Sequence, residues 1–155
     1  MLARVGRGVG WLFILALLLL LASAVWSLLY GLQHATTLRL GDAVVDVTIA
    51  DTPGARTKGL ADRQELGISA GLLLVYERES TWEVTMKNMR FAIDVVWLNK
   101  KKEVVHITKN ISPDTYPEVF QPDKPARYVL ELPAGTVEMK HIRIGQVAHF
   151  DLPLR

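Results

Sequence analysis

Residues 92–108 have the sequence AIDVVWLNKKKEVVHIT, and this stretch decides the fold class. Its first seven residues are almost wholly apolar, which is typical of a strand that is covered on both faces. The polar residues 99–102 give a turn signal, and residues 103–108 then alternate between the two sides of a second strand. Two strands joined by a short polar turn predict a β-hairpin, with its first strand at the centre of a sheet.

The rest of the chain from Leu38 onward mostly follows the same period of two. Further strands are predicted at residues 43–50, 70–76, 83–88, 127–132 and 147–150. Four prolines between residues 113 and 125 predict a long irregular loop, because proline lacks the N–H group that a strand ladder needs.

Helical signals are confined to two short stretches. Thr52 is a good N-cap with Pro53 at the first helical position, and helical spacing continues to Arg63. A second helical turn is predicted over residues 136–141. The chain has no alternation of strands with helices and no internal repeat. We therefore expect a mainly β domain, closed as a barrel or packed as a sandwich, with one short helix across an end.

The N-terminal segment Trp11–Tyr30 contains twenty residues and no charge, about the length of a transmembrane helix. Arg4 and Arg7 precede it, and positive charge on that side predicts a cytoplasmic N-terminus. The expected order is a cytoplasmic segment over residues 1–10, a transmembrane helix over 11–30, a linker over 31–37 and an extracytoplasmic domain over 38–155. The membrane is then a partner of this chain, which we expect in the periplasm or at the cell surface.

A cleaved signal peptide is the alternative interpretation of the same segment. Ala22, Ser23 and Ala24 match the small-x-small pattern at which a signal peptidase cuts, and cleavage there would give a secreted protein. The apolar run continues to Tyr30, further than a signal peptide needs, which favours the anchor. Both interpretations deliver the domain to the same side of the membrane.

Charge and cysteine content exclude several functions. The chain of 155 residues has eighteen basic and sixteen acidic side chains, and Arg4 and Arg7 are the only charged residues before Ala35. The exported domain is therefore formally neutral and lacks the positive surplus that nucleic-acid binding requires. Because there is no Cys, thiolate nucleophiles and Cys-based metal or iron–sulfur sites are excluded.

Several polar residues fall within the predicted sheet. Asp94 lies in the most apolar strand, where a carboxylate must be paired or hydrogen-bonded. The candidate network of structural or ligand-binding residues is Arg56, Arg63, Lys87, Asn88, Asp94, Arg127 and Glu131. Lys87 and Asn88 are adjacent in a predicted strand and would point to opposite faces. The network is either a set of ion pairs that fixes the helix to the sheet, or a pocket whose cations receive an anionic or carbonyl group.

The familiar catalytic patterns are missing. The four histidines have no metal-ligand spacing, and no serine lies in a nucleophile elbow. There is no phosphate-binding glycine loop. We therefore predict no catalytic residue, no metal and no cofactor, although Asp94 and Glu131 could form a hydrolytic carboxylate pair. His106 is expected to be a half-buried sheet residue, and Trp82 would be a ligand platform if it were exposed beside Thr85 and Met89.

Five ordered blocks carry a resemblance to a known family. They are Thr52–Arg63, Gly71–Tyr76, Met86–Asn88 with Asp94 six residues beyond, Val104–Ile107 and Pro125–Gly135. Together they cover nearly all of residues 43–150, and the chain resembles the domain of unknown function 192 family, as a membrane-anchored member. The resemblance implies a compact, mainly β, jelly-roll-like domain, often exported, and it brings no established activity.

Three positions depart from that family's pattern. The family usually has an aromatic residue where Thr85 stands, a Thr in place of Met89 and a Pro in place of Ala92. These changes alter the rim next to the most specific block, so a ligand held there by other members does not transfer to this chain.

We expect the protein to be a membrane-anchored, extracytoplasmic binding or accessory module rather than a catalyst. Its partners would be other membrane proteins or an envelope ligand. One alternative is a structural subunit of a larger membrane complex, held by the N-terminal helix. The other is an envelope hydrolase or transferase that uses Asp94 with Lys87 or Arg127.

Overall fold

The computed structural model describes residues 6–33 and 35–152, and the surroundings of side chains for residues 10–25 and 36–152. The chain divides into two compact units, residues 1–34 and 35–155. Each unit is described by itself.

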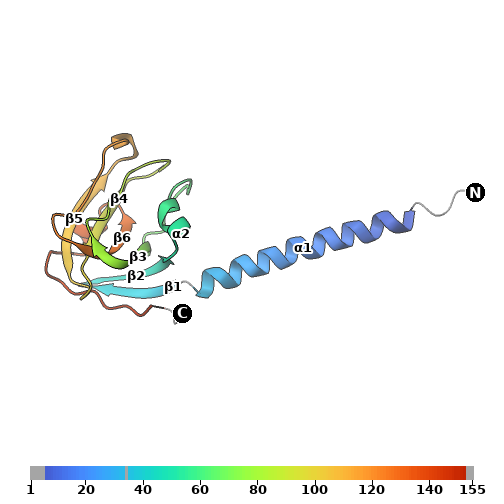
Figure 1. Cartoon of the computed structure of the whole chain (residues 1–155), viewed down its shortest axis with the longest axis horizontal. Coiled ribbons are helices and arrows are strands. Elements are labelled where there is room, and N and C mark those ends of the chain that lie inside the picture. The colour runs from blue at the N-terminus through green and yellow to red at the C-terminus, as the bar shows by residue number, and fades with distance from the viewer. Residues whose placement is uncertain (1–5, 34, 153–155) are drawn as a thin grey trace, which may run out of the picture. The chain divides into compact units, whose positions relative to one another are not determined.

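The first unit consists of helix α1, Gly6–Gln33 (Figure 1). The side chains of residues 11–25 are exposed, and all of them are apolar except that of Ser23. Ser23 donates a hydrogen bond from its hydroxyl to the Leu20 carbonyl at 2.8 Å, which keeps that polar group satisfied within the helix. Over the described residues, no helix meets both the length and the hydropathy of a membrane span.

The second unit is built on one mixed sheet of six strands (Figure 1). The strands are β1 Ala35–Leu40, β2 Ala43–Ala50, β3 Ala70–Ser80, β4 Ile93–Leu98, β5 Val104–Ile111 and β6 Ala126–Pro133. Their order across the sheet is β1-β2-β3-β6-β4-β5. Only β2 and β3 pair in parallel, and the other neighbours are antiparallel. The mainly β class is therefore confirmed. The expected jelly-roll arrangement differs from the structure at the β2–β3 pair, because a jelly roll is built of antiparallel strands.

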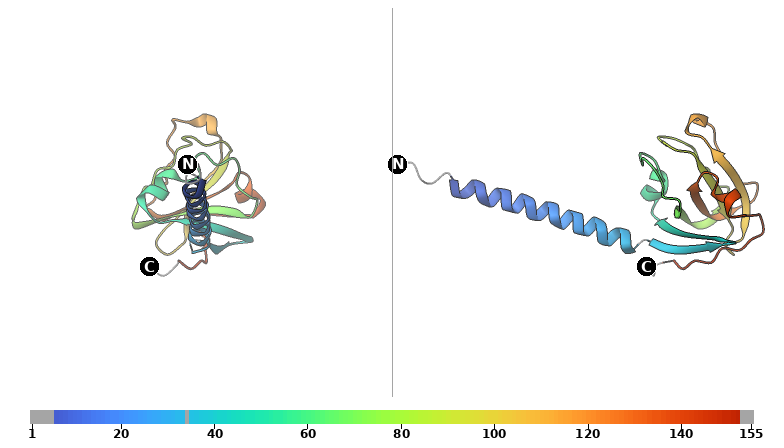
Figure 2. Two further views of the ribbon diagram at one scale, coloured as in Figure 1. Left: turned by 90° about the vertical axis from the view of Figure 1, so that its right-hand side faces the viewer. Right: turned by 180° about the vertical axis from the view of Figure 1, so that it is seen from behind.

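The C-terminal segment connects the two edges of the sheet. His149 exchanges two main-chain hydrogen bonds with Arg39 of β1, at 2.9 and 2.8 Å. Two residues earlier, Val147 bridges to Glu103 at the start of β5. The predicted strand at 147–150 is thus a pair of isolated bridges that closes the curved sheet, whose curvature is visible in the right-hand view of Figure 2.

Most predicted elements are found, and the differences have local causes. The hairpin over 92–108 forms as β4 and β5 around the turn Asn99–Lys102. β1 begins at Ala35, so the last residues of the predicted linker belong to the sheet. Residues 83–88 are not a strand: Val84 bridges to Phe120, and Asn88 has a φ of 57°, a left-handed conformation that ends strand geometry.

Two short helices complete the domain. Helix α2, Pro53–Lys58, begins as predicted, with the Thr52 hydroxyl accepting a hydrogen bond from the Ala55 N–H at 3.2 Å. It ends earlier than expected because Gly59 has a φ of 52° and a ψ of −131°, a conformation that only glycine adopts readily. Helix α3, Thr136–Met139, confirms the second helical turn, and a 3₁₀ turn η1, Pro113–Thr115, lies in the proline-rich loop.

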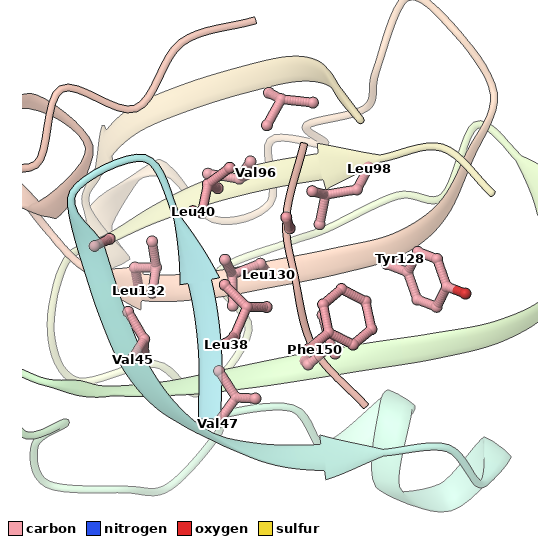
Figure 3. Close-up of a cluster of buried hydrophobic side chains, with 14 of the residues drawn as sticks. Leu38, Leu40, Val45, Val47, Val96, Leu98, Tyr128, Leu130, Leu132 and Phe150 are labelled. Carbon is pink, nitrogen blue, oxygen red and sulfur yellow. The ribbon is translucent and has the colours of Figure 1, made fainter. Parts of the chain in front are cut away.

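Hydrophobic side chains fill both faces of the sheet. Figure 3 shows the first cluster, gathered between the curved strands; it includes Leu38, Leu40, Val45, Val47, Val96, Leu98, Tyr128, Leu130, Leu132 and Phe150. The second cluster, on the other face, includes Leu60, Leu72, Leu74, Val84, Met86, Ile93, Val95, Trp97 and Val129. Because side chains alternate along β6, Arg127, Val129 and Glu131 face the second cluster.

Candidate functional site

A cavity of about 460 Å³ opens on the face of the second cluster. It lies between α2 with the residues that follow it, the end of β3, and the segment that precedes β4. Its lining includes Arg56, Lys58, Gly59, Leu60, Leu74, Tyr76, Trp82, Glu83, Thr85, Lys87, Met89, Ile93 and Glu131. The volume is in the range of small-molecule sites, and the lining combines apolar side chains with several charged ones.

Glu131 is the unusual group in this cavity. It lies in the middle of β6, opposite Leu72 of β3 and Val95 of β4, and its side chain is 5% exposed. Its Oε2 atom is buried and has no hydrogen-bond partner in the described part of the chain. Burial raises the pKa of this carboxyl to about 7, and the positive charge of Arg63 opposes that shift. A carboxyl group with this pKa changes its protonation state near neutral pH, and Glu131 lines the cavity.

The backbone at the end of α2 leaves room for this carboxyl. A β-carbon added to Gly59 would lie 3.7 Å from Glu131 Oε2, so the main chain passes directly over the carboxyl group. The positive φ of Gly59 turns the chain there, and the next residue, Leu60, is buried in the second cluster. Gly59 thus brings the chain close to Glu131 while adding no atom that would fill the cavity.

A stack of three side chains forms one wall. The Arg56 guanidinium carbon lies 5.0 Å from the centre of the Tyr76 ring, which stacks on the Trp82 ring at 3.8 Å with an interplanar angle of 9°. Arg56 Nη1 donates to the main-chain carbonyls of Asp51 at 2.6 Å and Val75 at 3.0 Å, which fixes the guanidinium in place. Burial and the nearby Glu131 raise the pKa of Tyr76 while Arg56 lowers it, so its phenol stays neutral.

Trp82 lies beside Thr85 and Met89, and its role as a ligand platform stays a prediction. Trp82 is half-buried, and it lines the cavity together with Thr85 and Met89. Its ring nitrogen donates to the carbonyl of Arg78 at 3.3 Å, and its own carbonyl accepts from the Trp97 ring at 2.9 Å. Two of the three positions where this chain departs from the family pattern, Thr85 and Met89, thus line the cavity.

Asp94, the other buried acid, belongs to a different part of the sheet. Its oxygens accept from the main-chain N–H groups of Asn110 and Val137, both at 2.8 Å. Among the described residues, no Lys or Arg lies within ion-pair distance of it. Asp94 therefore joins β4 to β5 and to the start of α3, and the ion pairs expected for it with Lys87 or Arg127 are absent from the described residues.

Among the described residues, none of the other candidates shares a hydrogen bond or an ion pair with Asp94. Arg56, Lys87 and Glu131 line the cavity, and the charge of Arg63 acts on Glu131. Arg127 lies at the start of β6, where its Nε donates to the Tyr76 carbonyl at 3.3 Å. Asn88 is part of a turn, and its carbonyl accepts from the Asp62 N–H at 3.0 Å. The structure brings Lys87 and Glu131 to one cavity and leaves Asp94 on the opposite face of the sheet.

Sequence reasoning missed two features of this site. Tyr76 and Gly59 are cavity residues, but their identities carry no chemical signal on their own. Alternation along β6 puts Glu131 and Val129 on one face of the sheet. The position of Glu131 between the apolar Leu130 and Leu132 is the sequence signal that could have identified it as a buried acid. His106 is half-buried as expected; its Nδ1 lies 3.2 Å from an oxygen of Asp123.

Comparison with known proteins places the chain in a family. The family model DUF192, described as "Uncharacterized ACR", matches residues 36–150. A UPF0127 protein of Pyrococcus furiosus is 32% identical over 103 residues, which are 65% of this chain and 83% of the relative. The five blocks identified in the sequence lie within the matched region.

Two solved structures have a similar fold. One, from Sinorhizobium meliloti 1021, is described as a candidate transcription regulator; it has a TM-score of 0.71 and 25% identity, and the match covers 75% of this chain and 93% of that chain. The other, from Novosphingobium aromaticivorans DSM 12444, is a protein of unknown function with a TM-score of 0.69 and 22% identity, covering 74% of this chain and 83% of that chain. The second likeness concerns the fold alone.

Proposed function

The chain belongs to the DUF192 family, and from that premise we propose that it is a binding module whose site is the Glu131 cavity. The observation that carries the proposal is the buried Glu131 Oε2, which has no hydrogen-bond partner in the described protein and belongs to a side chain that lines a cavity of about 460 Å³. An unpaired buried polar atom costs about 1–3 kcal/mol. A ligand that bonds to this atom would remove that cost.

The lining supports binding rather than a specific reaction. The cavity has an aromatic wall of Tyr76 and Trp82, and apolar side chains such as Met89 that can hold the body of a small molecule. The enzymatic alternative required Asp94 to act with Lys87 or Arg127, but Asp94 is held by two main-chain amides on the other face. A binding function needs no further catalytic group.

We further propose that the N-terminal segment tethers the module to a membrane, with the domain outside the cytoplasm. The support is the uncharged run of residues 11–30 behind Arg4 and Arg7. A reporter that is active only outside the cytoplasm, fused after Arg155, should be active, and the full-length mass should persist in the membrane fraction. Recovery of a soluble product that begins at Val25 would replace the anchor with a cleaved signal peptide.

A structural role in a larger membrane complex, with the N-terminal helix as the main contact, is the competing proposal. It predicts that the helix, and not the cavity, determines which proteins are co-purified. Pull-down of the full chain and of a Glu131→Gln variant should then recover the same partners.

The binding proposal is tested by screening small molecules against the full chain in a mild detergent. Labelled methyl groups of Met89 and Ile93 report on the cavity in NMR spectra. We expect some ligands to shift these signals, and we expect Trp82→Ala to lower the affinity for those ligands at least tenfold. Tyr116→Ala, which removes an exposed aromatic ring in the proline-rich loop, is the matched control and should leave affinity unchanged. If no compound shifts the cavity methyl groups, the cavity is not a binding site.

A further inference from the structure

Positive charge surrounds the Glu131 cavity. The ionisable groups around Glu131 are Arg56 and Lys58 from α2, Tyr76 from β3, and Glu83 and Lys87 from the segment before β4, all of which line the cavity. Arg63, from the loop after α2, and Arg127, from β6 itself, lie nearby without lining it. β4 itself contributes the apolar Ile93, because its acid, Asp94, lies on the other face. The lining therefore holds three cations, Arg56, Lys58 and Lys87, and two carboxyl groups, Glu83 and Glu131.

This balance determines which charge a ligand can carry. A cationic ligand would meet the three positive side chains of the lining, whereas an anion would be attracted by them. Glu131 would repel an anion only while it is itself ionised. Once protonated, its carboxyl is an O–H donor, and the anion can accept from it.

The geometry of Glu131 favours this donor role. Glu131 lines the cavity, its buried Oε2 has no protein partner, and no Lys or Arg of the described chain forms an ion pair with either oxygen. Arg56, which lines the cavity, donates hydrogen bonds from Nη1 to two main-chain carbonyls, and its guanidinium is therefore a positive charge held in a fixed position. The stacked rings of Tyr76 and Trp82 add a flat wall beside it.

We propose that the cavity binds the carboxylate of a small planar molecule, with protonated Glu131 donating a hydrogen bond to the carboxylate and with the ring of the ligand against the wall of Trp82 and Met89. The inference rests on the proposed binding function and adds the chemical class of the ligand. No covalent bond is made or broken. One proton is held on Glu131 in the complex, so binding takes up a proton wherever free Glu131 is ionised.

The sign of the pH dependence follows from that proton. The pKa of Glu131 is raised to about 7, so the free site is mostly protonated below pH 7 and mostly ionised above it. Affinity for a carboxylate should therefore be constant below pH 6 and should fall about tenfold for each pH unit above 7. A ligand that instead donates to ionised Glu131 would show the opposite trend.

Three probes of nearly the same size separate these cases: benzoate, benzyl alcohol and benzylamine. Binding to the full chain in mild detergent is followed through the methyl groups of Met89 and Ile93 between pH 5.5 and 9. We expect benzoate to bind at least tenfold more tightly than benzylamine at pH 6, and we expect only benzoate to lose affinity as the pH rises.

Two variants localise the effect. Glu131→Gln keeps a neutral donor of similar shape, so it should bind benzoate with an affinity that does not change with pH. Lys87→Gln should weaken benzoate severalfold and leave benzyl alcohol unchanged, whereas Lys101→Gln, in the exposed β4–β5 turn, should affect neither.

The outcomes distinguish the two proposals. If benzylamine binds most tightly, or if benzoate affinity rises with pH, Glu131 is an acceptor and the carboxylate proposal is overturned while the cavity remains a binding site. Binding of benzyl alcohol without benzoate has the same meaning. If none of the probes shifts the cavity methyl signals, the proposed carboxylate site and the binding function both fail.

Discussion

Two carboxyl groups are buried within one residue of each other in register across β4 and β6, yet their surroundings differ completely. Asp94 pairs with Leu132, and the next pair is Val95 with Glu131. Asp94 is fully buried on the face of the first cluster and accepts from two main-chain amides. Glu131, on the face of the second cluster, has an oxygen with no protein partner. The same kind of group thus has both oxygens hydrogen-bonded at one position and one oxygen without a protein partner at the other.

The cause of the difference is what lies above each face of the sheet. Over Asp94, the start of α3 and the left-handed Asn110 aim N–H groups at the carboxylate. The residue over Glu131 is Gly59, which has no side chain, and both residues line the cavity. A buried acid is therefore informative only together with its partners.

Removal of the Asp94 carboxylate should have the largest effect. Asp94→Ala removes the acceptor of two hydrogen bonds, from the buried Val137 N–H and the part-buried Asn110 N–H. Hydrogen bonds to a charged group contribute about 2 kcal/mol each, so we expect the free energy of unfolding to fall by about 4 kcal/mol. Urea unfolding of the full chain in mild detergent measures this, and Asp42→Ala, an exposed turn acid, is the control. Lys87→Met should cost little and should not restore stability to the Asp94 variant; restoration would instead indicate an ion pair between the two.

Glu131→Gln should change how the free energy of unfolding depends on pH. Unlike the Asp94 substitution, it should make the variant more stable relative to the parent as the pH rises. The folded domain holds the Glu131 proton up to about pH 7, whereas the unfolded chain releases it near 4.5. This group therefore contributes stability below pH 4.5 that is lost as the pH rises through 7, about 3 kcal/mol in all.

In the Glu131→Gln variant that loss should be missing, so its stability relative to the parent should increase between pH 4.5 and 8. Unfolding curves at several pH values measure the difference. Glu65→Gln, at an exposed acid, should follow the parent curve. Parallel curves for the parent and the Glu131 variant would contradict the assignment of a raised pKa to this carboxyl.

Thr52→Ala should destabilise helix α2, next to the cavity, without affecting the region around Asp94. The substitution removes the acceptor for the Ala55 N–H, and loss of an N-cap costs about 1 kcal/mol. Hydrogen exchange should accelerate in α2, which carries Arg56 towards the cavity, while the amides of Asn110 and Val137 that bind Asp94 keep their protection. Equal acceleration at both places would mean that the two regions open together.

Arg63→Gln should produce the smallest effect. The positive charge of Arg63 lowers the pKa of Glu131, so its removal should move the titration of Glu131 to higher pH. The carboxyl carbon signal of Glu131 in NMR spectra reports the midpoint. Lys101→Gln is the control, and an unchanged midpoint in the Arg63 variant would show that this charge does not reach Glu131.

Local chemistry made much of the fold predictable. The apolar run at 93–98 and the polar turn after it gave the β4–β5 hairpin, and Thr52 with Pro53 gave the start of α2, because strand alternation and helix caps depend on neighbours in sequence. The strand expected at 83–88 was wrong, since its alternation is overridden by the left-handed turn at Asn88. The pairing of β2 with β3 in parallel depends on distant segments and had no local signal.

By itself, the sequence determined which residues alternate, where helix α2 begins, and that Glu131 and Asp94 lie in apolar strands. Only the tertiary structure decided their roles, because the hydrogen-bond partners of a buried group come from segments far away in the chain. Val137, which is 43 residues from Asp94, supplies one amide. Gly59 lies over Glu131 from a helix end that precedes it by more than half the domain, and it leaves the carboxyl facing a cavity.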